Sequence, residues 1–280
     1  MRGISENRAG REAIRSSLTP KLLALLSTCA LFSCAPASDE DSYSDACVLP
    51  SDQTQTLTGR WYRLPVFISF RDGHFNSYEL GLAMDAADNW NRFFGATQGV
   101  AVFDYGTRAS PRLDQKTTSP PAGGICSEAT PDVSRPGGYR TSLTIFKRTT
   151  WIYATSAIAI TSTCTTAASP VKALTNAMME LNYQTYFTSG KPVPDLTSIF
   201  THELGHLIGL DHSCAGSYDA SSPTHPPVCS NSGLDSSYFS AVMYPSFAFK
   251  SDGVTGIPRK SLNGNDQGRT SCLYGPNALK

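Results

Sequence analysis

The residues best suited to chemistry lie in one short stretch, HELGHLIGLDHS, at positions 202–213. His202 and His206 are four residues apart, so on a helix they share one face and both imidazoles can reach a single metal ion. Gly209 can adopt a positive φ without steric cost, and a turn there would bring His212 back as a third ligand. Three protein ligands leave one position on zinc for water, which is typical of catalytic zinc sites.

Glu203 follows the first histidine and is the candidate general base. It would take a proton from zinc-bound water as that water attacks a zinc-polarised peptide carbonyl, and would then pass it to the leaving amine. Chance is a poor explanation, since these five positions would coincide in roughly one sequence of this length in a hundred thousand. A structural zinc site is the better alternative, but such a site usually fills its fourth position with protein and has no need of Glu203.

A helix must carry this stretch. Asp195 can accept backbone N–H groups as its N-cap, and an apolar stripe should face the core while His202 and His206 face a cleft. The stripe consists of Leu196, Phe200, Leu204, Leu207 and Ile208.

Other segments should form the sheet on which that helix lies. Aromatic and β-branched residues predict strands at residues 61–70, 100–105, 141–146 and 151–163, and residues 178–182 are ambiguous by periodicity. Helical spacing predicts a helix at residues 76–94 that ends at Gly95. Residues 106–140 are rich in Pro, Gly, Ser and Thr and read as a long loop that Cys126 could staple. The order of elements indicates an α/β fold.

The N-terminus reads as an export signal. Basic residues precede a short apolar run at residues 22–32, which is too short to span a membrane, so residues 1–33 are expected to be a signal peptide. The following Cys34 resembles the lipidated cysteine of a bacterial lipobox, with an ordinary secretory signal as the alternative. Residues 34–58 would form a polar, flexible tether, and residues 59–280 the catalytic domain. We expect an outer-membrane or cell-surface lipoprotein, or otherwise a secreted protein.

Six cysteines remain after the signal and Cys34 are set aside, which suggests three disulfides in an exported chain. Cys214 with Cys229 is the most local pair, and for the other four we favour Cys126 with Cys164 and Cys47 with Cys272. The chain has 23 basic and 23 acidic residues, so it lacks the basic excess of a nucleic-acid binder. We expect a monomer whose partner is a protein or peptide substrate, with a membrane contact through the lipid anchor only.

Residues 202–213 match the HExxHxxGxxH signature of the metzincin metallopeptidases, and their last four residues resemble the matrixin branch. The resemblance assigns zinc binding to His202, His206 and His212, catalysis to Glu203 and the turn to Gly209. It also implies a methionine in a tight turn beneath the metal, and residues 241–245 (AVMYP) resemble that turn. Met243 would then be the apolar floor of the site, although taken alone it would be read as a core methionine.

The resemblance extends more weakly over residues 61–275. It implies an α/β (α+β) catalytic domain with a twisted, mostly parallel sheet, an antiparallel edge strand, an active-site helix and a small C-terminal subdomain after the third histidine. The edge strand would lie at residues 157–162, its neighbour at 178–182 and the closing helix at 265–274. Extended substrates of this family pair with the edge strand. Residues 244–262 would form the wall of the main specificity pocket.

The chain also departs from the family. Many matrixins bind a second, structural zinc through three further histidines, whereas only His74 and His225 are left here, so we expect one zinc ion. Cys47 lacks the residues that flank the latency cysteine of matrixins. No clear loop motif supports a calcium site, which stays an open alternative.

Two main hypotheses follow. The first is an exported zinc endopeptidase that acts on proteins in or outside the cell envelope. The second is a zinc-containing binding lipoprotein that hydrolyses nothing. Glu203 favours the first, because a scaffold could lose the base without consequence. A structural or adhesive surface protein would explain the cysteines but not the histidines.

Overall fold

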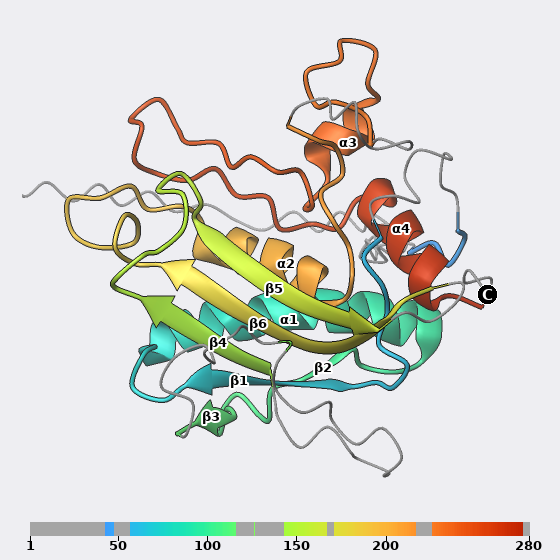
Figure 1. Ribbon diagram of the computed structural model, residues 1–280, viewed down its shortest axis with the longest axis horizontal. Helices are drawn as coiled ribbons and strands as arrows, with labels where there is room; N and C mark the ends of the chain where they lie inside the picture. The colour runs from blue at the N-terminus through green and yellow to red at the C-terminus, as the bar shows by residue number, and fades with distance from the viewer. Residues whose placement is uncertain are drawn as a thin grey trace, which may run out of the picture. The chain divides into compact units, whose positions relative to one another are not determined.

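A six-stranded sheet forms the frame of the protein in the computed structural model, which describes residues 43–47, 57–115, 126, 143–166, 171–216 and 226–276 (Figure 1). The strands are β1 (Val66–Arg71), β2 (Phe103–Asp104), β3 (Leu113–Asp114), β4 (Leu143–Arg148), β5 (Ala159–Thr166) and β6 (Ala173–Asn182). Their order is β2-β1-β4-β6-β5, and β3 also pairs with β1. The pairs are parallel except β5 with β6, so the expected mostly parallel sheet with an antiparallel edge is confirmed.

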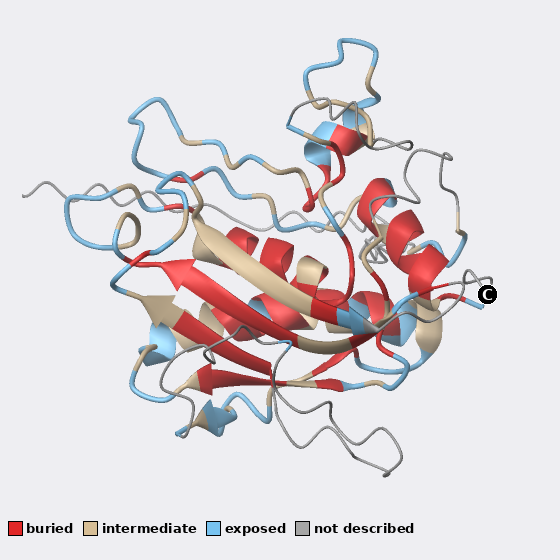
Figure 2. Ribbon diagram, viewed as in Figure 1, coloured by how far each residue is buried: buried red, intermediate tan, exposed pale blue. Residues whose placement is uncertain are grey.

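Two long helices, α1 (Ser77–Gln98) and α2 (Leu196–Leu207), pack against each other on one face of this sheet (Figure 1). Between them Trp90 of α1 is fully buried and donates its indole N–H to the Thr201 carbonyl of α2 at 2.8 Å. In Figure 2 the buried residues follow most of β1, β4, β6 and α2, whereas the edge strand β5 is mostly intermediate. The short helix α3 (Ser236–Ser240) and the closing helix α4 (Gly264–Tyr274) follow after the third histidine.

Helix α1 runs past the end expected at Gly95. The capping box between Asn76 and Glu79 begins it as the sequence indicates, but it continues to Gln98 and closes at Gly99, whose φ is +70°. A glycine inside a helix costs only about 1 kcal/mol, and burial of Phe93 and Phe94 on the same turn offsets that cost. The left-handed C-cap is supplied by the later glycine.

The strands are shorter or shifted relative to the sequence expectations. β1 begins at Val66 rather than at residue 61, and β2 keeps only two residues. β5 begins at Ala159, because residues 151–158 form a loop, and β6 begins at Ala173, before the expected residue 178. β3 lies within the segment expected to be a loop. Its two residues pair with Phe70 and Arg71 at the C-terminal end of β1. A pairing of two residues between distant segments leaves no periodic signal in the sequence.

Three disulfides join the pairs favoured from the sequence: Cys47–Cys272, Cys126–Cys164 and Cys214–Cys229. Cys47 lies in the expected tether, yet its bond holds residues 43–47 on the domain, and the Tyr43 ring packs edge-on against Phe93 at 5.4 Å. The expected signal peptide, Cys34, His225 and much of the tether lie outside the described residues. Within the described part of the chain, no helix is long and apolar enough to cross a membrane.

Candidate metal centre

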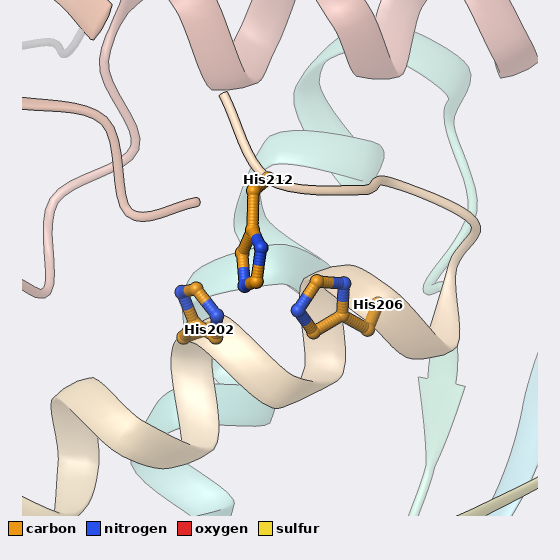
Figure 3. A group of neighbouring side chains, drawn as sticks. All are labelled: His202, His206 and His212. Atoms are coloured by element: carbon orange, nitrogen blue, oxygen red, sulfur yellow. The ribbon is translucent and has the colours of Figure 1, made fainter. Parts of the chain in front are cut away.

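Three imidazole rings converge at the end of α2. His202 and His206 project from successive turns of the helix, and His212 returns from the segment that follows it (Figure 3). Their ring centroids are 4.8, 5.2 and 4.9 Å apart, and one nitrogen from each lies within 4.8 Å of the others. This spacing lets all three nitrogens reach one ion, as the sequence pattern predicts.

The local sequence explains how α2 begins and where it stops. Asp195 caps its first turn by accepting the Ser198 amide at 2.8 Å. After Leu207 the chain turns at Gly209, whose φ is +95°. A side chain is excluded there, since a Cβ atom would lie 1.7 Å from the Gly59 carbonyl oxygen. The turn redirects the chain so that His212 can reach the other two rings.

The carbonyl groups at the end of α2 are satisfied by distant aromatic residues. The Trp61 indole donates to the Leu207 carbonyl at 2.6 Å, and the Tyr274 hydroxyl donates to the Ile208 carbonyl at 2.9 Å. Helix ends leave their last carbonyls without partners inside the helix. Trp61, which precedes β1, and Tyr274 of α4 therefore hold the end of the helix that carries His206.

Two of the imidazoles are oriented by backbone carbonyls. His202 Nδ1 lies 2.7 Å from the Val242 oxygen, and His206 Nδ1 lies 2.7 Å from the Leu210 oxygen. A carbonyl oxygen only accepts, so each Nδ1 carries the hydrogen and each Nε2 keeps a lone pair. Burial, and the charge of neighbouring histidines, lower the pKa of His202 well below its usual value and that of His206 to about 4. Neutral imidazoles with free Nε2 lone pairs are the donors that a transition metal requires.

Met243 lies in a buried turn that packs against α2, the helix that carries His202 and His206. Its sulfur packs against Gly205 of α2 so closely that a Cβ at Gly205 would lie 2.2 Å from it. The Met243 carbonyl also accepts the Ser213 amide at 2.8 Å, beside His212. The role of Met243 as the apolar floor of a metal ion stays a prediction.

Asp266, which the sequence reasoning missed, holds the turn that contains Met243. Asp266 in the first turn of α4 is fully buried and accepts the amides of Val242 at 2.8 Å and Met243 at 3.2 Å. Because the Val242 carbonyl orients His202, the Asp266 carboxylate acts on the metal site through two intervening groups. Its one signal in the sequence is the capping box with Asn263, which marks a helix start and says nothing of the turn it reaches.

Glu203 is buried beside the triad and lines a cavity of about 350 Å³ together with His206 and His212. Burial raises the pKa of its carboxyl to about 7, and a hydrogen bond from the Thr161 hydroxyl opposes that rise. The edge strand β5 lines the same cavity through Ala159, Ile160, Thr161 and Thr163. A carboxyl group with a pKa near neutrality can both take and return a proton.

The remaining histidine of the described residues lies elsewhere. His74 accepts the Lys147 amide at 3.2 Å and stacks edge-on against Phe146, away from the triad. Among the described residues, His202, His206 and His212 are the one group of three His, Cys, Asp or Glu side chains that could hold a metal ion.

Neither the protein-family models nor the curated proteins include a match to this chain. Three converging nitrogen donors, two of them on a cavity that the buried Glu203 carboxyl group also lines, fit a metal ion with an open position.

Proposed function

We propose that this protein is a zinc-dependent endopeptidase of the metzincin type. The observation that carries the proposal is a group of three imidazoles whose nitrogens converge, two of which, His206 and His212, line one cavity together with Glu203. A structural site would close its fourth position with protein, whereas here the space beside His206 and His212 is a cavity.

Zinc held by His202, His206 and His212 would polarise a peptide carbonyl and lower the pKa of a water molecule. Glu203 would take a proton from that water and later deliver it to the nitrogen of the leaving amine. Burial raises the pKa of this carboxyl group in the metal-free protein, which favours its taking up a proton. The neutral imidazoles need no deprotonation before they bind the ion, which favours loading near neutral pH.

The substrate in this proposal is an extended peptide. β5 stands at the end of the sheet order, pairs with β6 on one side, and lines the cavity with four of its residues. A strand in that position can bind a peptide backbone through its main-chain groups, while side-chain pockets set the preference. We further propose that the enzyme is exported and anchored by a lipid at Cys34, a setting with which the three disulfides agree.

The test compares purified full-length protein with Glu203→Gln and His206→Ala variants. We expect the parent protein and E203Q to retain about one equivalent of zinc after dialysis, and H206A to lose it, by atomic absorption. E203Q should lower kcat/KM on an unfolded protein substrate by about a hundredfold to ten-thousandfold. A zinc-loaded parent protein that cleaves nothing in a broad peptide library would instead support a binding lipoprotein.

A further inference from the structure

The hydroxyl group of Thr161 reaches from the sheet to the general base. Its Oγ1 atom lies 2.7 Å from Glu203 Oε2 and 3.3 Å from the Glu203 carbonyl oxygen. A threonine hydroxyl has one proton to donate, so the shorter contact, to the carboxylate, receives it. Among the described residues this is the one side-chain hydrogen bond made to the Glu203 carboxylate.

Both ends of this contact stand on rigid elements. Thr161 lies within the paired part of β5, opposite the fully buried Met179 of β6. Threonine is β-branched, so its χ1 angle has few accessible values and the hydroxyl is held in place by the strand. Glu203 lies in the middle of α2. The mobile part of the pair is the carboxylate itself, because the last torsion of a glutamate side chain is broad and poorly defined.

We propose that Thr161 is a positioning residue for the general base Glu203, an inference that rests on the proposed function. Its hydroxyl fixes Oε2 of Glu203 and so leaves Oε1 as the proton acceptor on the cavity side. Without this bond the carboxylate would rotate among several orientations, of which a fraction could reach the reacting water.

This role predicts a particular kinetic signature. Thr161 would act on proton transfer through Glu203, so removal of its hydroxyl should lower kcat and leave KM almost unchanged. A residue that only packed β5 against α2 would lower stability and zinc content instead. The two outcomes are separable by experiment.

The experiment uses Thr161→Val, which replaces the hydroxyl with a methyl group of similar size, and Thr161→Ser, which restores the donor. The control is Thr175→Val, the same exchange on β6, where the hydroxyl donates to the Cys164 carbonyl at 3.2 Å and not to Glu203. Steady-state kinetics on a quenched fluorescent peptide, zinc content and thermal unfolding are measured for each zinc-loaded full-length protein. Thr161→Ala replaces T161V if T161V does not fold.

We expect T161V to lower kcat about tenfold to a hundredfold, the range for one hydrogen bond to a charged group, with KM within about threefold and zinc content unchanged. T161S should recover most of kcat, and T175V should match the parent protein. Crystal structures of zinc-loaded T161V and T161S should show the Glu203 carboxylate displaced or split in T161V and restored in T161S.

An undisturbed Glu203 carboxylate in the T161V crystal structure overturns the proposal, as does a T161S variant that stays as slow as T161V. The crystallographic comparison does not depend on turnover. If the parent protein cleaves no peptide, the proposed function fails, while the position of the carboxylate in T161V and T161S still decides whether Thr161 positions it.

Discussion

Among the glycines that the structure describes, Gly209 is the one whose replacement by alanine should most disrupt the candidate metal centre. Two costs add at this position. At φ +95° alanine takes a conformation that costs roughly 1–2 kcal/mol for a residue with a Cβ atom. The new Cβ atom would also lie 1.7 Å from the Gly59 oxygen and 2.8 Å from its carbonyl carbon, so one of the two backbones must move.

The backbone around Gly59 is held in place by hydrogen bonds to the residues that follow α2. The Thr58 amide donates to the Gly209 carbonyl at 2.7 Å, and Leu57 pairs with Leu210 in an antiparallel bridge. Movement of residues 57–61 would break these bonds together with the hydrogen bond from the Trp61 indole to the Leu207 carbonyl of α2. We therefore expect Gly209→Ala to lower the free energy of unfolding by about 3–5 kcal/mol, the range in which backbone strain and lost contacts combine.

Gly253→Ala is the matched control. Its φ is +66°, and a Cβ atom there would meet nothing within 4 Å, so only the conformational cost of roughly 1–2 kcal/mol applies. Urea unfolding of the metal-free proteins measures both variants, and a competing chelator measures zinc affinity. G209A should also bind zinc more weakly, because the turn at Gly209 directs His212. If G209A is no less stable than G253A and binds zinc as the parent protein does, the close approach to Gly59 does not constrain the site.

Two further predictions concern the groups around the triad. Asp266→Asn should lower the free energy of unfolding by about 1–3 kcal/mol and weaken zinc binding, because Asp266 accepts the amides of Val242 and Met243. Asp252→Asn is the control: that carboxylate also accepts two backbone amides, but on an exposed loop, so zinc affinity should stay unchanged, and equal losses of zinc affinity would refute the link to the metal site. The metal-free protein should lose stability between about pH 6.5 and 4, since burial lowers the folded pKa of His206 to about 4 and the unfolded chain binds more protons in that window. The urea midpoint should therefore drop more between pH 7 and pH 5 for the parent protein than for His206→Gln. Equal drops in the two proteins would contradict this prediction.

Much of the candidate metal centre was predictable because its geometry is local. The spacing of His202 and His206 follows from the period of a helix, and the need for Gly209 follows from a turn that requires a positive φ. The helix start at Asp195 is equally a matter of neighbouring residues. The alternation of strands and helices was enough to predict the α/β class. An expected export signal and an even number of remaining cysteines were enough to predict three disulfides.

Tertiary structure decided what surrounds those residues. Asp266 reaches the turn at Met243 from a later helix, and Thr161 reaches Glu203 from the edge of the sheet. Both contacts join residues more than twenty positions apart, so no periodicity, cap or spacing in the sequence could reveal them. The same reason explains the two-residue strand β3 and the helix α1 that runs past Gly95: partners from distant segments outweighed the local preference.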